Sequence, residues 1–336
     1  MSVWTRYRLR LERKRLLLRA WRKSRELSRV VFRGDRRKPG DILLFATLWN
    51  ERLRLPWFLD YYRRLGVSHF FIIDNGSNDG SREYLADQED VSLWHARGSY
   101  RRSRFGMDWI NALLYRHGAG HWVLVVDPDE FLVYPFMDTR PLPALTDWLD
   151  ASAIKSFPAM LLDMYPRGPV SEARYAEGRD PFEILRWFDA GNYVISRNPH
   201  YANLWIQGGP RLRVLFEGAP DRAPALNKIP LVRWRKGYAY VSSTHMLLPR
   251  GLNYVYDEWG GEKPSGCLLH AKFIAPLAEK VEAEMTRRQH YGGSREYVAY
   301  RRVMAEKGGF WTEKSTEYRG WRQLENLGLI SRGNWA

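Results

Sequence analysis

The chain has 336 residues, of which 53 are Lys or Arg and 38 are Asp or Glu, and its formal net charge is +15. This length can bury a sizeable core in one large domain with additions or in two smaller ones, and a single cysteine, Cys267, excludes an internal disulfide framework and is typical of a reducing compartment. No apolar stretch approaches the roughly 20 residues that cross a bilayer, and the first residues are too densely charged for a secretory signal.

Residues 1–38 hold most of the net charge. Fifteen Lys and Arg stand there against three acids, which leaves +12 of the total of +15. The apolar residues that interrupt the basic ones are Trp4, Tyr7, Leu11, Leu16 to Leu18, Trp21, Val31 and Phe32. This composition predicts a basic amphipathic helix on an anionic membrane surface, although Lys14 falls on the apolar face. A solvated helix that packs on the body and a segment that binds nucleic acid are the alternatives, and we do not expect nucleic acid.

Apolar runs then alternate with helical patterns. The runs expected to form strands are 41–49, 67–73, 91–94 and 122–126, and the helices expected between them are 55–65 and 104–117. Residues 74–81 (DNGSNDGS) follow the second run and are turn formers whose backbone can approach a nucleotide closely. This order predicts βαβ units, and therefore an α/β fold with a mostly parallel sheet.

The stretch 122–135 (WVLVVDPDEFLVYP) is the most informative, because a buried-strand pattern ends in Asp127, Asp129 and Glu130. Acids at the carboxyl end of a strand lie where open α/β sheets bind their ligands. Three acids within four residues repel one another unless a cation compensates, and Mg²⁺ or Mn²⁺ bridges such carboxylates to a substrate phosphate. The motif therefore predicts a metal–diphosphate site, with a solvated acidic turn as the alternative.

The segments ATLWNE, IIDNGSNDGS and VVDPDEFLVYP, in this order, resemble the family 2-like glycosyltransferases with the GT-A fold, in a bacterial subgroup near the family 92 enzymes. The resemblance implies a Rossmann-like sheet flanked by helices, with a nucleotide-sugar half at 39–150 and an acceptor half at 151–275. A helical extension is expected at 276–336. It also implies metal-dependent transfer of a sugar from a nucleoside diphosphate sugar to a glycan or lipid-linked acceptor in cell-surface polysaccharide synthesis.

On the donor side, the resemblance implies that Asp129 coordinates the metal. Asp127 would face the ribose or donor sugar and contribute to the metal shell, and Glu130 would orient a neighbour or touch the sugar. Asp74 corresponds to an acid that contacts the nucleoside in similar enzymes, and Asn75 follows it. Asp74 is equally suited to an ordinary Asx turn.

Three more donor-side residues come from segments that flank these strands. Asn50 and Glu51 follow the first strand and could line the same crevice or start a helix. Arg104 precedes a helix that resembles the family's diphosphate-side segment, although an arginine in this position is more often a salt-bridged surface residue.

The histidine expected to complete the metal shell is His270, in a short apolar segment that resembles the family's late histidine segment. Neutral imidazole is a normal Mn²⁺ ligand beside carboxylates. His245 is the competing candidate. Lys272 would emerge on the same face as His270 and neutralise a phosphate oxygen.

The catalytic base that takes the acceptor's proton is expected among the acids Asp163, Glu183 and Asp189. Asp163 is preferred because it lies on a predicted strand, 159–166, among apolar residues that could raise its pKa. We expect the enzyme in the cytoplasm, peripheral on the inner face of the cell membrane. The alternatives are a nucleotidyltransferase, and a non-catalytic protein that binds nucleic acid or membrane through residues 1–38.

Overall fold

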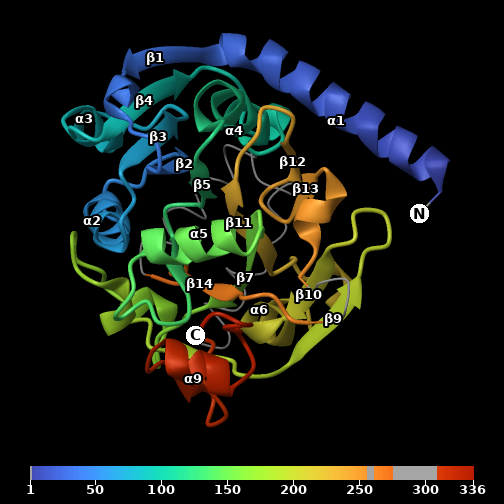
Figure 1. Cartoon of the computed structure of the whole chain (residues 1–336). Coiled ribbons are helices and arrows are strands. Elements are labelled where there is room, and N and C mark those ends of the chain that lie inside the picture. The colour runs from blue at the N-terminus through green and yellow to red at the C-terminus, as the bar shows by residue number, and fades with distance from the viewer. Residues whose placement is uncertain (1, 256–260, 275–308) are drawn as a thin grey trace.

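The computed structural model describes residues 2–255, 261–274 and 309–336. Its centre is a nine-stranded sheet (Figure 1). In spatial order the strands are β1 (Leu27–Val31), β4 (Val91–Ala96), β3 (His69–Asp74), β2 (Ile42–Leu48), β5 (Trp122–Val125), β11 (Asn227–Arg233), β7 (Ser156–Asp163), β14 (Gly266–His270) and β6 (Glu130–Val133). Strands β2, β3, β4, β5, β7 and β14 run in one direction, and β1, β11 and β6 run against them. The predicted α/β fold with a mostly parallel sheet is therefore confirmed.

Helices cover both faces of this sheet, because its strands are apolar on both sides. Leu43 and Phe45 of β2 belong to one core, whereas Ile42, Leu44 and Ala46 belong to the other. The helices are α1 (Val3–Lys23), α2 (Leu55–Leu65), α3 (Ser81–Ala86), α4 (Met107–Leu113), α5 (Leu142–Ala151), α6 (Gly209–Leu215) and α9 (Trp321–Asn326). Helix α4 continues as a π-helical turn to Gly118, and α2 ends at Gly66, whose φ of 102° lies in the left-handed region.

Three small two-stranded sheets stand beside the main one. They pair β9 (Tyr193–Arg197) with β10 (Leu204–Gly208), β12 (Ala239–Ser242) with β13 (Met246–Leu248), and β8 (Trp187–Phe188) with β15 (Thr316–Glu317). Of the predicted helical extension at 276–336, residues 276–308 lie outside the described residues, and the part from 309 onward forms β15 and α9.

The basic N-terminal segment is a helix only in its first part. Helix α1 lies across α4, and the chain then forms β1, which pairs antiparallel with β4 at the edge of the main sheet (Figure 1). The main sheet also joins strands from both predicted halves, since β11 lies between β5 and β7. The boundaries at 38, 150 and 275 stay predictions. Among the described residues, no helix combines the length and apolar character needed to cross a membrane.

Candidate active site

The topology brings three separate segments to one edge of the sheet. Asp127 to Glu130 form the turn between β5 and β6, at the carboxyl end of β5. Strands β7 and β14 are parallel neighbours whose last residues, Asp163 and His270, are in register, and Glu130 stands opposite His270 on the other side. Residues 127, 163 and 270 are far apart in sequence, so only the sheet order places them together.

His270 links two carboxylates at this edge. Its Nδ1 lies 2.7 Å from Asp163 Oδ1, and its Nε2 lies 3.3 Å from Asp129 Oδ2. The backbone N–H of Ala271 also donates to the Asp129 carbonyl at 2.7 Å. Burial alone would lower the pKa of His270, but Asp129 and Asp163 outweigh it and raise the pKa to about 9.

Asp163 is held on both oxygens, which does not suit the predicted catalytic base. His270 occupies Oδ1, and the buried Arg211 guanidinium donates to Oδ2 at 2.7 Å. Burial acts to raise the pKa of Asp163, yet Arg211 and His270 lower it to about 2. A carboxylate this acidic is a weak proton acceptor at neutral pH, so the apolar surroundings expected from the sequence do not decide its pKa. Its position instead fixes the His270 ring.

Of the three acids, Asp127 shows the raised pKa that is expected from their mutual repulsion. Burial first, and the Glu130 charge second, raise the pKa of Asp127 to about 7. For Asp129 the balance is reversed, because burial is outweighed by His270 and Arg54 and the pKa lies far below its usual value. Glu130 Oε1 pairs with the Lys228 ammonium at 2.9 Å, and both side chains are buried. Part of the compensating charge thus comes from the protein itself.

Two cations at this edge, Lys228 and Arg54, were missed by the sequence analysis. Lys228 interrupts the apolar run of β11, a pattern that could have marked it as buried. Arg54 directly precedes α2, where it donates to Glu51 at 2.8 Å and to the Ala271 carbonyl at 3.3 Å. Within the part of the chain that the structure describes, the buried Arg54 Nε has no hydrogen-bond partner. Arg54 thereby connects Glu51 to the segment that carries His270.

Asp129 and His270 fit two ligands of one divalent ion. Two ligands at about 2.1 Å from an ion stand about 3 Å apart when they lie at right angles, close to the 3.3 Å between these donor atoms. The hydrogen bond from Nδ1 to Asp163 fixes the ring so that Nε2 faces Asp129, as metal-ligating histidines are commonly held. Within the described part of the chain, no group of three or more His, Cys, Asp and Glu side chains forms a fuller metal cluster. Such a partial set fits Mg²⁺ or Mn²⁺, which usually binds through one or two carboxylates plus substrate phosphates.

Asp74 and Asn75 form the turn after β3 and are turned inward. Asp74 accepts from the Ser77 N–H at 3.0 Å and from Arg82 at 2.6 and 2.8 Å, and it is fully buried. Burial would raise the pKa of Asp74, but the bonds from Ser77 and Arg82 lower it. The Asn75 amide donates to the Ala96 and Gly98 carbonyls. These contacts hold Asp74 within its own loop, through a bond to the backbone three residues on instead of the two that an Asx turn spans.

Asn50 has a φ of 53° and exchanges hydrogen bonds with Asn78 at 2.8 and 3.0 Å, which ties the loop after β2 to the loop after β3.

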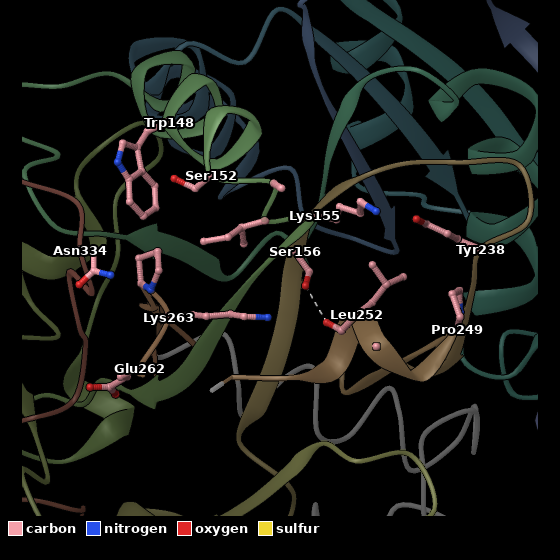
Figure 2. A pocket seen from close by; sticks show the side chains of 14 residues that line it. Trp148, Ser152, Lys155, Ser156, Tyr238, Pro249, Leu252, Glu262, Lys263 and Asn334 are labelled. Atoms are coloured by element: carbon pink, nitrogen blue, oxygen red, sulfur yellow. Dashed lines mark hydrogen bonds between the residues drawn. The ribbon is translucent and has the colours of Figure 1, made fainter. Parts of the chain in front are cut away.

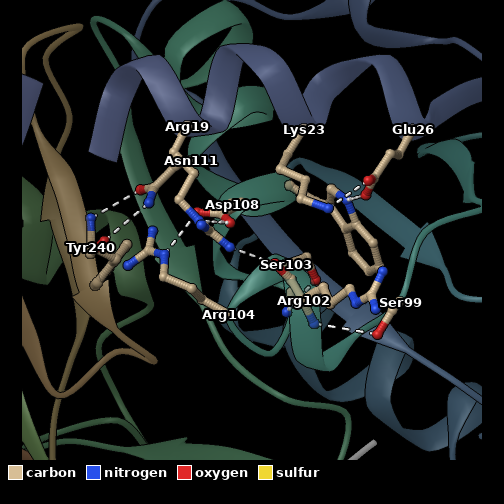
Figure 3. Close-up of polar contacts among 12 residues, drawn as sticks. Arg19, Lys23, Glu26, Ser99, Arg102, Ser103, Arg104, Asp108, Asn111 and Tyr240 are labelled. Carbon is tan, nitrogen blue, oxygen red and sulfur yellow. Dashed lines mark hydrogen bonds and ion pairs between the residues drawn. The ribbon is translucent and has the colours of Figure 1, made fainter. Parts of the chain in front are cut away.

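Arg104 lies under helix α1 (Figure 3). Its Nε donates to Asp108 Oδ1 at 2.7 Å, and its Nη1 donates to the Val241 carbonyl. Arg19 of α1 donates to the other Asp108 oxygen at 2.6 Å. Arg104 is therefore a partner of a buried carboxylate, as the salt-bridge alternative anticipated.

The remaining predicted residues have different surroundings. Glu183 is exposed in a short 3-10 turn, Pro181–Glu183. Asp189 receives two hydrogen bonds from Arg213 at 3.0 Å and one from the Tyr165 hydroxyl, which leaves it poorly available to an acceptor. Lys272 is half-buried, and its charge contributes to the lowered pKa of Asp129. Its phosphate-neutralising role stays a prediction.

His245 contacts the carbonyl of Asn227 through Nδ1 at 2.6 Å. Burial, followed by the nearby Lys228 charge, lowers its pKa to about 3.

A cleft of about 590 Å³ opens elsewhere on the molecule (Figure 2). It is bordered by the end of α5, the start of β7 and the 3-10 turn Arg250–Asn253, with Trp148, Ser156 and Leu252 among its lining residues. Ser156 and Asp163 are the two ends of β7, and at about 3.3 Å per residue the cleft lies roughly 20 Å from the acidic edge. It does not belong to the candidate active site.

Part of the chain is similar to glycosyltransferase family 92 proteins. It is 30% identical to one from Arabidopsis thaliana over 114 residues, which are 31% of this chain and 18% of that protein. It is 29% identical to one from Oryza sativa subsp. japonica over 108 residues, which are 30% of this chain and 17% of that protein. The chain thus matches less than a fifth of the length of these curated relatives. No family model matches the chain.

Solved structures give only weak likenesses. A UTP-bound UGPase from Acinetobacter baumannii aligns over 79% of this chain and 83% of its own, with 8% identity and a TM-score of 0.28. A putative glucose-1-phosphate thymidylyltransferase from Bacillus anthracis aligns over 85% and 93%, with 9% identity and a TM-score of 0.29. Scores this low carry no inference about the activity of this chain.

Proposed function

We propose that the chain is a metal-dependent glycosyltransferase that moves a sugar from a nucleoside diphosphate sugar to a hydroxyl of a glycan or lipid-linked acceptor. The observation that carries the proposal is the Asp129–His270 pair at the carboxyl edge of the sheet, with its donor atoms 3.3 Å apart and His270 anchored by Asp163. The partial similarity to family 92 glycosyltransferases supports the same class of reaction.

The residues at this edge suit a diphosphate leaving group. A divalent ion bound there would neutralise negative charge on the diphosphate as the sugar leaves. Asp129 and His270 would hold that ion, with Asp127 as the further predicted ligand. Lys272 and Arg54 add positive charge beside Asp129, where both act on its pKa. Asp163 and Arg211 would keep the His270 ring in place without touching the substrate.

The acceptor's proton needs a carboxylate or histidine to receive it. Of the three acids predicted for this role, Asp163 and Asp189 are bound by arginines, whereas Glu183 is exposed. Glu183 is therefore the candidate base that we retain.

We further propose that the enzyme works at the inner face of the cell membrane, in cell-surface polysaccharide synthesis. The concentration of positive charge in residues 1–38, +12 of the total +15, supports this location.

A thermal-shift screen of nucleoside diphosphate sugars with and without Mn²⁺ tests the donor, since a bound ligand raises the melting temperature. We expect one donor to stabilise the wild type and an Asp60→Asn control only when Mn²⁺ is present, and to leave Asp129→Asn unchanged. Asp60 suits the control because it is exposed and forms a salt bridge with Arg64 on its own helix. A donor that raises the melting temperature equally with and without Mn²⁺, or that still raises it in Asp129→Asn, would exclude the proposed site.

Labelled donors then separate the two enzyme classes. Transfer of the labelled sugar to an acceptor is the result that the proposal predicts. Transfer of the labelled nucleotide without the sugar would instead establish the nucleotidyltransferase alternative.

A further inference from the structure

Helix α1 has an inner face that is fastened to the body. Leu9, Leu16 and Ala20 are buried on this side, and Leu9 and Leu16 pack with Ala239 and Leu248. The inner side also makes polar contacts, since Glu12 accepts from the Tyr201 hydroxyl at 2.6 Å. The inner face of α1 is therefore already packed against the body of the protein.

The outer face of α1 is nevertheless apolar. At 3.6 residues per turn, Tyr7, Leu11 and Leu18 point directly away from the buried residues, and Trp4 and Trp21 flank them. The exposed fractions on this face are Val3 80%, Trp4 72%, Tyr7 51%, Leu18 47% and Trp21 57%. The rings of Trp4 and Tyr7 lie 5.9 Å apart, so they form a continuous aromatic surface. The solvent-facing side of a helix is typically polar, and an exposed apolar face of this kind is typical of an interaction surface.

Basic residues border this apolar face. Arg8, Arg15 and Arg22 are exposed and recur at intervals of seven residues, which places them in one row along the helix. Lys14 lies within the face itself. The whole helix carries nine Lys and Arg against the single acid Glu12, a net charge of +8.

We infer that the outer face of α1, defined as Val3, Trp4, Tyr7, Leu11, Leu18 and Trp21 with the Arg8, Arg15 and Arg22 row, docks on an anionic phospholipid surface. Aromatic side chains favour the headgroup region, and the arginines complement acidic lipids while their stems remain in contact with apolar groups. This surface would supply the contact for the proposed membrane location, and its biological purpose rests on the proposed function. Lipid binding by the outer face of α1 can be measured independently of enzyme activity.

Other occupants fit this surface less well. A second copy of the chain would bring two helices of charge +8 together, which repel each other. Nucleic acid would pair with the arginines, but it would leave the exposed Val3 and Leu18 in contact with water. A bilayer surface offers both negative charge and an apolar layer.

The docked helix would also be connected to the candidate site's side of the sheet. Arg19 donates to the Arg102 carbonyl at 2.5 Å and to Asp108 at 2.6 Å (Figure 3). Arg102 belongs to the 3-10 turn Arg101–Ser103, which follows the carboxyl end of β4. The attachment therefore fastens α1 to α4 and to the turn that follows β4.

Vesicle co-sedimentation tests the inference with three matched variants of the full chain. The first replaces the arginine row (Arg8→Gln, Arg15→Gln, Arg22→Gln), and the second replaces the aromatic residues (Trp4→Ser, Tyr7→Ser, Trp21→Ser). The control removes the same charge at exposed positions near the paired strands β8 and β15 (Arg186→Gln, Lys314→Gln, Arg319→Gln). Helix α9 follows β15 and lies at the other end of the molecule from α1 (Figure 1). Vesicles of phosphatidylcholine with and without phosphatidylserine are the probe.

We expect the wild type and the control to bind only the vesicles that contain phosphatidylserine, and less tightly as salt is added. The arginine variant should bind about 100-fold more weakly, because each basic residue near an anionic surface contributes about a fivefold increase in affinity. The aromatic variant should also lose most of its binding. All three variants should melt like the wild type, since the replaced side chains are exposed.

Equal losses in the control and the arginine variant would show that only net charge matters and would overturn the inference. So would binding that neither α1 variant weakens, tighter binding to duplex DNA or RNA than to vesicles, or dimers that the aromatic variant abolishes. Asp129→Asn should sediment like the wild type. Failure of the donor screen with intact, α1-dependent vesicle binding would therefore reject the proposed function and leave the docking surface standing.

Discussion

Asp108 and Asp129 are both carboxylates with cationic neighbours, yet their surroundings differ. The Asp108 side chain is fully enclosed, and a guanidinium occupies each of its oxygens, Arg19 at 2.6 Å and Arg104 at 2.7 Å. The Asp129 side chain keeps 22% of its surface exposed and faces His270, which is held from behind by Asp163. The protein itself binds both oxygens of the carboxylate between the two arginines, whereas the carboxylate beside the anchored imidazole is the metal ligand that we propose.

The largest expected effect concerns the anchor behind His270. Asp163→Ala leaves the Arg211 guanidinium, 6% exposed, without its carboxylate, and removing one partner of a buried pair costs about 3–5 kcal/mol of unfolding free energy. Asp108→Ala should cost less, roughly 1–3 kcal/mol, because water reaches Arg19, which is 46% exposed. Urea unfolding of the two variants measures the difference. A larger cost at Asp108 would reverse the comparison.

The next effect concerns metal affinity. His270→Ala should weaken Mn²⁺ binding by about 10–100-fold, the range typical of a disturbed metal site. His245→Ala should leave that affinity unchanged, because its Nδ1 is bound to the Asn227 carbonyl and lies outside the Asp129 contact. Calorimetric titration of both variants decides between the two histidines. A larger loss at His245 would mean that the wrong histidine was chosen.

The affinity for a metal ion should also depend on pH, because His270 must lose a proton to bind the ion. With a pKa of about 9, His270 is protonated on both nitrogens at neutral pH, and Nε2 must lose its proton before it can bind a metal. Apparent Mg²⁺ affinity should therefore rise by up to about tenfold per pH unit until pH 9, and this rise should disappear in His270→Ala.

The metal-free protein should respond to pH in the opposite direction. A raised pKa means that protonated His270 stabilises the fold fully below its unfolded pKa of about 6.5, and that this stability is lost as the pH rises through about 9. Urea unfolding at several pH values measures it. Stability that increases over this interval only in the wild type would contradict the buried Asp129–His270–Asp163 arrangement.

The smallest effect is expected at Arg104. Arg104→Gln removes one of the two arginines on Asp108, which should cost roughly 1–2 kcal/mol of unfolding free energy. Donor affinity should be unchanged, since Arg104 is committed to Asp108 and to the Val241 carbonyl. A clear loss of donor affinity at unchanged stability would return Arg104 to the diphosphate-binding role suggested by the family resemblance.

Sequence patterns were sufficient for the elements that carry local signals. The apolar runs gave β2, β3, β4 and β5 within one or two residues, and Gly66 ends α2 as expected. The turn chemistry of 74–81 left two roles open for Asp74, and local hydrogen bonds to Ser77 and Arg82 now account for its burial.

Long-range partners could not be predicted in this way. Arg211 reaches Asp163 across 48 residues and Lys228 reaches Glu130 from β11, so neither pair leaves a pattern in a short window of sequence. Burial and contacts between distant segments also decide the pKa values, since burial and the Glu130 charge raise the pKa of Asp127, whereas His270 lowers the pKa of Asp129 against its burial. The position of the acids at the edge of the sheet could therefore be predicted from the sequence. Their pKa shifts could be obtained only once the fold was known.

Calorimetric titration tests the proposed metal–diphosphate site at Asp129 and His270 most directly. The common nucleoside diphosphates are titrated, with and without Mn²⁺, into the wild type, Asp129→Asn and the exposed control Asp60→Asn. We predict that one diphosphate binds the wild type and the control only with Mn²⁺, and that Asp129→Asn weakens this binding by about 100-fold. Binding that needs no Mn²⁺, binding that Asp129→Asn retains, or the absence of binding by every nucleoside diphosphate would contradict a metal–diphosphate site at Asp129 and His270.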